Sequence, residues 1–243
     1  MKYSEDTIDN KNFFKRFSHK SRFVVAKKLL YKYKPLNNIS MLDFGCGNGF
    51  FIKYLIENKF NFNFSAYDPV DEQINEMNDL FNSSKIDNVK IYDDYDLIND
   101  KFDIISCLET LEHFREEDQK NHLLKMRKLL KPDGVIYISI PIEVYLSGFI
   151  KIILRVLMGQ SQENTSLTNI FKTLFGLKIS NPDNFSKNYL TTSEDYLNTH
   201  MGFYYFDLIN LIKKMGFKVE EIKFSPFPFL KSFLNSQIFI KIK

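Results

Sequence analysis

Three glycines within five residues mark the stretch of this sequence with the clearest chemical potential. Gly45, Gly47 and Gly49 follow a short apolar segment, residues 40–44, and precede an apolar stretch that begins at Phe50. A glycine turn bends the backbone sharply and lets a ligand approach closely, because no Cβ stands in the way. The N–H groups at the start of the helix expected next would point at that ligand. The pattern predicts a nucleotide-type pocket at the carboxyl end of a strand.

A carboxylate lies at the distance that such a pocket requires. Asp68 ends a second apolar segment, residues 62–67, and lies 19 residues after Gly49, close to the spacing of about 20 in dinucleotide-binding folds. A carboxylate there can accept hydrogen bonds from both hydroxyls of a ribose. Because Pro69 follows, Asp68 also suits an ordinary turn. The glycine turn at the right distance favours the ligand role.

The elements that position these residues alternate between strands and helices. Continuous apolar runs are typical of buried parallel strands, and apolar residues at helical spacing separate them. The expected strands cover residues 40–44, 62–67, 89–92, 104–108 and 135–140, and the helices between them cover 50–58, 71–81 and 118–130. A last helix over 203–215 precedes two strands, 218–224 and 237–242, which are close enough in sequence to form an antiparallel hairpin.

Four features together resemble the class I S-adenosylmethionine (SAM) dependent methyltransferases. They are the DFGCGNG stretch that begins at Asp43, FDIISCLETLEHF at 102–114, LLKPDGVIYISIP at 129–141, and the terminal hairpin. A nucleotide-binding dehydrogenase would continue in βα units instead of ending in a hairpin. The resemblance covers about residues 39–141 and 200–242.

This resemblance implies an α/β fold: a Rossmann-like, seven-stranded, mostly parallel sheet with helices on both faces and an antiparallel last strand. It implies a single methyltransferase domain over residues 1–243. Residues 11–34 would form an N-terminal helical cap, in which His19 and Arg22 could face the site or lie on the surface, and residues 142–200 would be an insertion after the fifth strand.

The resemblance also implies SAM as the cofactor and a set of residues around it. Asp93, or its neighbour Asp94, would reach the adenine amino group, and Glu109 would bind the amino group of the cofactor or orient the acceptor. Both cysteines are interpreted as small apolar lining residues rather than nucleophiles. The predicted cofactor-binding residues are Asp43, Gly45, Cys46, Gly47, Gly49, Asp68, Asp93, Cys107 and Glu109.

Two histidines are candidates for catalysis. An oxygen nucleophile must lose its proton, and histidine is a suitable base near neutral pH. His113 follows the fourth strand at the rim where the acceptor would lie, and His200 ends the insertion. A packing or capping role for His113 is equally open, because many methyltransferases of this class need no base. The sequence has no His/Cys cluster with metal-ligand spacing, so no metal site is expected.

The expected acceptor is a small or glycan-linked molecule, methylated at an oxygen atom. Residues 200–203 and 225–228 resemble segments of bacterial methyltransferases linked to cell-surface polysaccharide synthesis. A lipid-like acceptor is an alternative, because residues 144–158 form a strongly apolar helix that could contact a membrane surface. Such a helix also suits a lid packed on the edge of the domain.

Two further alternatives concern partners. Residues 11–34 carry nine Lys or Arg and no acidic residue, which is compatible with a nucleic-acid acceptor or with a solvated helix face. The fourth strand lacks the Asn/Asp-Pro-Pro-aromatic motif of amino-group DNA methyltransferases, which argues against nucleic acid. A SAM-binding partner protein without catalysis is the other alternative. The oligomeric state is left open.

The composition of the chain excludes several classes of protein. The 243 residues are 44% hydrophobic with a net charge of +3, ordinary values for a globular protein. Two cysteines exclude a disulfide scaffold. The polar N-terminus does not resemble a signal peptide, and no run of about 20 apolar residues appears. We therefore expect a cytoplasmic protein.

Overall fold

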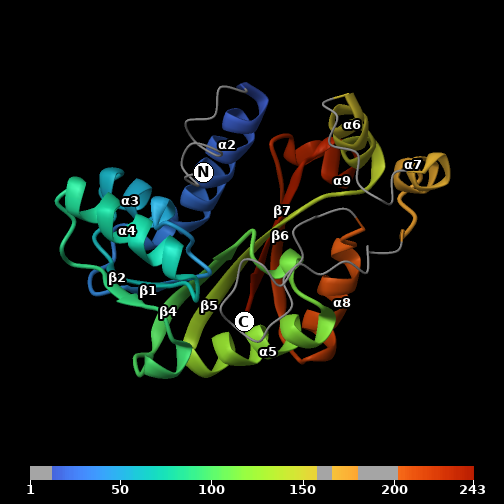
Figure 1. Cartoon of the computed structure of the whole chain (residues 1–243). Helices are drawn as coiled ribbons and strands as arrows, with labels where there is room; N and C mark the ends of the chain where they lie inside the picture. Colours follow the sequence, from blue (N-terminus) through green and yellow to red (C-terminus); the bar gives the residue numbers. More distant parts are fainter. Residues whose placement is uncertain (1–12, 158–165, 180–201) are drawn as a thin grey trace.

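The computed structural model describes residues 13–157, 166–179 and 202–243, with side chains described from residue 22 onward and up to residue 156 in the first range. Its seven strands form one sheet in the order β3-β2-β1-β4-β5-β7-β6 (Figure 1). The strands are β1 (Ser40–Phe44), β2 (Asn63–Tyr67), β3 (Lys90–Tyr92), β4 (Phe102–Leu108), β5 (Leu130–Pro141), β6 (Val219–Ser225) and β7 (Gln237–Ile242). Strand β7 pairs antiparallel with both β5 and β6, and the other pairs are parallel. This arrangement confirms the predicted fold class.

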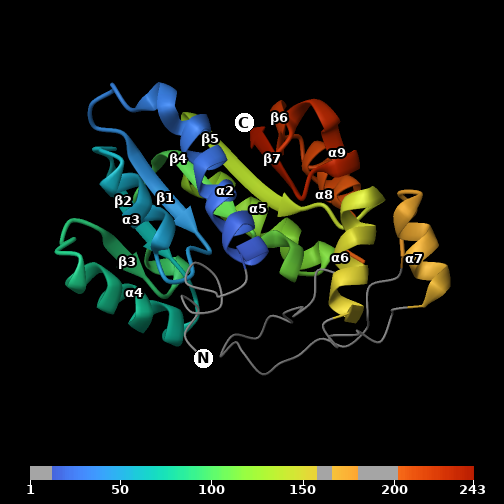
Figure 2. The ribbon, with the colours of Figure 1, turned by 90° about the horizontal axis from the view of Figure 1, so that it is seen from above.

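Helices cover both faces of the sheet, as Figure 2 shows from above. One face carries α2 (Phe13–Leu30), α3 (Phe50–Glu57) and α4 (Asp71–Ser83), and the other carries α5 (Glu116–Leu129) and α8 (Tyr205–Lys214). Short 3-10 turns follow α2, β3 and β4: η1 (Tyr31–Tyr33), η2 (Tyr95–Leu97) and η3 (Leu111–His113). The predicted cap helix is therefore α2, continued by η1.

The core consists of two apolar clusters, one on each face, because successive side chains of a strand point to opposite sides. On β1, Met41 packs with the α2, α3 and α4 side, whereas Leu42 packs with α5 and α8. On β5, Tyr137 and Ile138 divide in the same way. Burial on both faces explains why these strands are continuous apolar runs in the sequence.

The start of β5 differs from the sequence-based expectation. The sequence predicts a helix that ends at residue 130 and a strand that begins at residue 135, but β5 already begins at Leu130 and runs along β4. A Cβ on Gly134 would lie 2.8 Å from the carbonyl oxygen of Phe102, and Lys131 Nζ contacts Asp103 Oδ2 at 2.7 Å. Close backbone packing and an ion pair therefore keep this segment extended.

The insertion after β5 contains α6 (Tyr145–Leu157) and α7 (Leu167–Leu174). Helix α6 packs against α7 and against α9 (Lys231–Leu234), which follows η4 (Pro228–Leu230) between β6 and β7. Residues 158–165 and 180–200 of the insertion lie outside the described residues. Among the helices that the structure describes, none is long and apolar enough to cross a bilayer.

Candidate cofactor and acceptor site

The glycine turn connects β1 to α3 at the carboxyl end of the sheet, and most of its N–H groups already have partners. The N–H groups of Gly45 and Cys46 donate to the carbonyl oxygen of Tyr67 at 2.8 and 3.0 Å. The N–H of Gly47 donates to Asp68 Oδ2 at 2.8 Å, and that of Gly49 to the carbonyl oxygen of Cys46 at 3.1 Å. These four N–H groups are therefore not available to a ligand. What the turn offers is a backbone that a ligand can approach closely.

The three glycines share a left-handed conformation, with φ of 72°, 54° and 75°, but differ in what surrounds them. A Cβ on Gly45 would lie 2.5 Å from the Thr110 side chain, and one on Gly49 would lie 2.8 Å from side chains of α4. A Cβ on Gly47 would meet only Gln73 Oε1, at 3.5 Å. A side chain at Gly45 or Gly49 would therefore clash with the packed interior. A side chain at Gly47 would not, so there is space for a ligand beside its Cα atom.

The groups around Gly47 match the chemistry of a nucleoside ligand. Gln73 Oε1 is buried and has no hydrogen-bond partner in the part of the chain that the structure describes, a costly state that a ligand donor would relieve. Asp68, 7% exposed, accepts one N–H on each carboxylate oxygen, from Gly47 and from Val70 at 3.1 Å. An ionised carboxylate has about four acceptor positions, so two remain for ribose hydroxyls. These residues fit SAM.

Asp43 lies beneath the turn and is buried, with 2% exposure. It is the register partner of Ser106 on β4, whose hydroxyl donates to Asp43 Oδ1 at 2.5 Å. Burial raises the pKa of Asp43 to about 7, although the Ser106 hydrogen bond opposes the shift. Burial also raises the pKa of Asp68 to about 6, against the N–H groups of Gly47 and Val70. The hydrogen bond from Ser106 to Asp43 therefore links β1 to β4 directly before the glycine turn.

Cys46 is half-buried and Cys107 is fully buried, and the surroundings of each thiol oppose its ionisation. Burial, followed by the charges of Asp68 and Asp43, raises the pKa of the half-buried Cys46 well above its ordinary value. Burial likewise raises the pKa of Cys107, which is fully buried in the cluster that packs on α5. A thiol must ionise to act as a nucleophile, so this environment favours the apolar interpretation. For Cys107, core packing accounts for its position.

Asp93 and Asp94, which follow β3, differ in their local contacts. Asp94 accepts from the N–H of Asp96 at 2.9 Å and so caps η2. Asp93 is exposed beside it. Since Asp94 is used locally, Asp93 is the residue of the pair whose described contacts leave it available to an adenine amino group.

Glu109 directly follows β4 and has a strained backbone conformation, with φ of 53°, which a residue other than glycine adopts at some cost. Its N–H donates to the carbonyl oxygen of Ser139 at 2.9 Å, and its Oε1 accepts from Ser139 Oγ at 3.2 Å. Its Oε2 lies 3.6 Å from Nη1 of Arg22 on α2. Arg22 is 5% exposed, so this ion pair joins the cap helix to the rim of the site.

His113 follows in η3, at the same end of β4, and is half-buried. Its neighbour Glu112 is almost fully buried. Burial and the Glu109 carboxylate raise the pKa of Glu112 well above its ordinary range, which Arg22 opposes. His113 and Glu109 are thus brought to one rim by β4 and η3. The second predicted catalytic residue, His200, lies outside the described residues.

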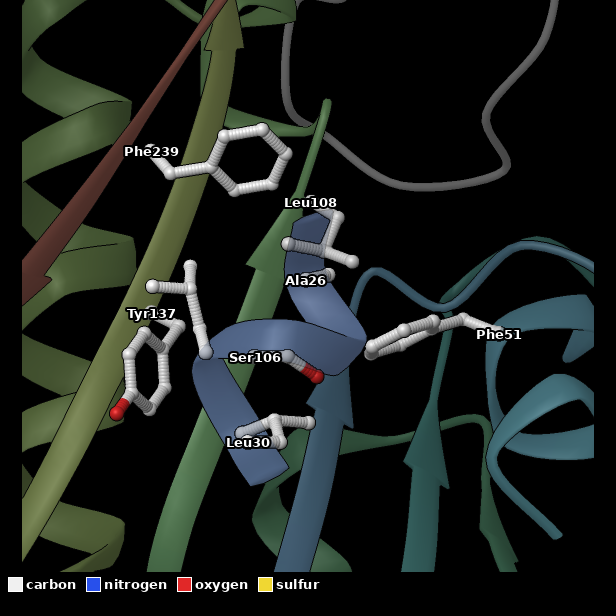
Figure 3. A pocket seen from close by; sticks show the side chains of 8 residues that line it. Ala26, Leu30, Phe51, Ser106, Leu108, Tyr137 and Phe239 are labelled. Atoms are coloured by element: carbon white, nitrogen blue, oxygen red, sulfur yellow. The ribbon is translucent and has the colours of Figure 1, made fainter. Parts of the chain in front are cut away.

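A small apolar pocket separates α2 from the sheet (Figure 3). Its volume is about 10 Å³, about the space of one water molecule. It is lined by Ala26, Leu29, Leu30, Phe51, Ser106, Leu108, Tyr137 and Phe239. The pocket is too small for a cofactor or an acceptor, so it is a packing gap beneath the cap helix.

Several residues near the site were not singled out in the sequence. They are Gln73 on α4, Ser106 on β4, Thr110 after β4 and Ser139 on β5. Ser106 lies within the FDIISC segment, and the parallel register of β1 and β4 that the fold class implies would have set it beside Asp43. The other contacts depend on tertiary packing that no local pattern records. Among the described residues, no group of three or more His, Cys, Asp and Glu side chains could hold a metal ion.

The fold and this site define a SAM-binding α/β enzyme, and sequence comparison agrees. A family model described as "Methyltransferase domain" matches residues 17–222, so the chain belongs to this methyltransferase family. SAM is its cofactor.

Curated relatives carry the name ubiquinone biosynthesis O-methyltransferase. The protein of that name from Rickettsia typhi is 28% identical over 160 residues, which cover 62% of this chain and 61% of the relative. The one from Rickettsia bellii is 30% identical over 118 residues, or 47% of each chain. The chain thus matches about half to three fifths of the length of these relatives.

Solved structures share the fold at low sequence identity. A SAM-dependent methyltransferase from Clostridium acetobutylicum superposes with a TM-score of 0.61 at 16% identity, covering 99% of this chain and 95% of that one. The magnesium protoporphyrin IX methyltransferase from Synechocystis, solved with bound S-adenosylhomocysteine (SAH), gives 0.59 at 13% identity, covering 96% and 88%. At this identity the likeness supports the fold alone.

Proposed function

We propose that this enzyme transfers the methyl group of SAM to an oxygen atom of a small-molecule acceptor. The observation that carries the proposal is the match to relatives named as O-methyltransferases, at 28% and 30% identity. The position of His113 at the rim beyond β4 supports it, because a hydroxyl acceptor must lose a proton.

In this proposal the residues of the turn hold the cofactor. Asp68 accepts hydrogen bonds from the ribose hydroxyls, and Gly47 lets the ligand lie against the backbone. Gln73 Oε1 accepts a hydrogen bond from a donor group of the ligand. Asp93 accepts a hydrogen bond from the adenine amino group. SAM, when bound, supplies a methyl group activated by its sulfonium.

The rim beyond β4 holds the acceptor. Glu109 is fixed by Ser139 and Arg22 and orients either the amino group of the cofactor or the acceptor. His113 accepts the proton of the acceptor hydroxyl. Holding an acceptor oxygen close and aligned supplies a large part of the acceleration in such transfers.

A panel of phenols and catechols, with amines and thiols of matched size, tests the proposal through release of SAH. We expect turnover of a hydroxyl compound and a loss of about a hundredfold or more in kcat for His113→Ala, with SAH affinity unchanged. Turnover of amines or thiols but of no hydroxyl compound would contradict oxygen transfer. Full activity of His113→Ala would remove the base from the proposal and leave the acceptor assignment intact.

Two observations bear on the choice between a lipid-like and a glycan-linked acceptor. A lipid-like molecule is favoured over a glycan-linked one, since the names of the relatives concern quinone synthesis and α6 is strongly apolar. The glycan-linked acceptor stays a prediction from sequence.

A further inference from the structure

Helix α6 turns its two basic residues toward the protein and leaves much of its apolar surface exposed, although Ile152 is buried. Its basic residues face the protein: Lys151 Nζ contacts Glu143 Oε1 at 2.9 Å, and Arg155 Nη1 contacts Glu143 Oε2 at 3.1 Å. Glu143 is 6% exposed. Ile150 and Leu154 lie four residues apart on one face and are both 44% exposed. An ordinary surface helix buries its apolar stripe and exposes its charges.

The neighbouring elements continue this exposed apolar surface. On α7 and just after it, Leu167, Phe171 and Phe175 are 76%, 61% and 70% exposed. On η4 and α9, Phe229 and Phe233 are 79% and 53% exposed. Helix α6 packs against both α7 and α9, and Figures 1 and 2 show the three side by side at one end of the molecule. Large exposed apolar surfaces of this kind mark interaction sites.

The charge of this surface indicates its partner. The described segments 145–157, 166–179 and 226–236 contain five Lys or Arg and no Asp or Glu. Lys151 and Arg155 are used by Glu143, and Lys178 contacts Asp207. Lys172 and Lys231 are exposed among the apolar side chains. Aromatic and aliphatic side chains interspersed with lysines suit a bilayer with anionic headgroups.

We propose that α6, α7 and the η4–α9 segment form a surface that binds peripherally to an anionic lipid bilayer. We call it the α6–α7–α9 surface. A second copy of the chain fits less well, because a symmetric dimer would bring together two surfaces that both carry positive charge and no acidic residue in the described segments. The proposal goes beyond methyl transfer and needs no knowledge of the acceptor.

Co-sedimentation with unilamellar vesicles tests the proposal with the full chain. We expect binding to a mixture of phosphatidylcholine and phosphatidylglycerol and weaker binding to phosphatidylcholine alone. The double substitution Phe171→Ser/Phe229→Ser should weaken binding by roughly a hundredfold, about tenfold for each phenylalanine removed from an apolar environment. Lys172→Glu/Lys231→Glu should abolish the preference for anionic vesicles.

The matched control is Leu97→Ser. Leu97 is 58% exposed and lies in η2, which follows β3 at the opposite edge of the sheet. This variant should bind vesicles as the wild type does. Each substituted side chain is exposed, so an unchanged circular dichroism melting curve will verify folding.

Three results would overturn the proposal. One is a wild type that binds neither vesicle, and another is a phenylalanine double variant that binds as the wild type does. The third is a dimer, measured by light scattering, that the phenylalanine substitutions dissociate, because the surface would then join two copies of the chain. Methyl transfer is not part of the readout, so a failed acceptor assignment would leave these results interpretable.

Discussion

At the scale of single residues, Asp43 and Asp68 hold protons more tightly than ordinary aspartates. Burial raises their pKa values from 3.8 to about 7 and about 6. Between about pH 4 and pH 7 the folded protein therefore binds more protons at these groups than the unfolded chain does. Their contribution to the free energy of unfolding is fully present below pH 4 and is lost as the pH rises through 6 and 7.

The test is the pH dependence of stability in the ligand-free protein. We expect the free energy of unfolding of the wild type to fall by a few kcal/mol more than that of Asp43→Asn between about pH 4 and pH 8, since one pKa unit corresponds to about 1.4 kcal/mol. Urea denaturation at several pH values measures this. Parallel pH profiles for the two proteins would show that Asp43 does not titrate in this range.

Asp68 should govern cofactor affinity. Asp68→Asn removes the charge that two ribose hydroxyls would meet, and hydrogen bonds to charged groups are worth about 1.5 to 3 kcal/mol. We expect SAH to bind tenfold to a hundredfold more weakly by calorimetry. Asp71→Asn, at an exposed carboxylate in the first turn of α4, is the control. Equal affinity of the two variants would remove Asp68 from the site.

The sequence alone predicted Asp68 and the glycine turn because their spacing is local. It did not predict that Thr110 and the side chains of α4 account for Gly45 and Gly49, or that Ser106 bonds Asp43. These contacts join residues far apart in the chain, and only the packed sheet brings them together.

At the scale of elements, α2 is attached to the sheet by a buried ion pair and by apolar packing. Arg22→Ala would leave the Glu109 carboxylate beside Glu112 without this partner, and breaking a buried pair costs about 3 kcal/mol. We expect that loss in the free energy of unfolding by urea denaturation. Lys28→Ala, at an exposed residue of the same helix, should change it by less than about 0.5 kcal/mol.

Removing both partners separates a charge effect from a packing effect. Without Arg22, the Glu109 carboxylate would be a charge without its ion-pair partner. Removing it as well, in Arg22→Ala/Glu109→Ala, should therefore recover part of the stability lost in Arg22→Ala. An Arg22→Ala protein as stable as Lys28→Ala would contradict the role of the ion pair.

Most elements were predictable because apolar periodicity decides them: β1 and β7 match their predicted bounds, and α4 and α6 lie within a few residues of them. The orientation of α6 was not predictable. Its two basic residues, Lys151 and Arg155, turn inward because they pair with the buried Glu143, only eight residues before Lys151.

At the scale of the molecule, the order of the sheet places the ends of β1, β2 and β4 together and the α6–α7–α9 surface at the opposite edge from β3. The proposed cofactor residues and the proposed lipid-facing surface are therefore carried by different parts of one sheet. Strand order could be inferred from the family resemblance, but the exposed surface could not, because exposure is a property of the packed chain.

Alanine substitutions at two glycines test whether the turn at Gly47 receives the cofactor. Gly47→Ala and Gly216→Ala each place an alanine at positive φ, 54° and 79°, and each should cost about 1 to 2 kcal/mol of stability. A Cβ on Gly216 would meet no described atom within 4 Å, and one on Gly47 has ordinary contact with Gln73 alone. The two variants therefore differ in the ligand site and hardly in packing.

Calorimetric titration of SAH into the wild type and these two variants is the most direct measurement. We expect Gly216→Ala to bind SAH as the wild type does. Gly47→Ala, equally folded, should bind SAH at least about tenfold more weakly, because the new methyl group would occupy the side on which the ligand lies. Equal SAH affinity of Gly47→Ala and Gly216→Ala would contradict binding of the cofactor at this turn.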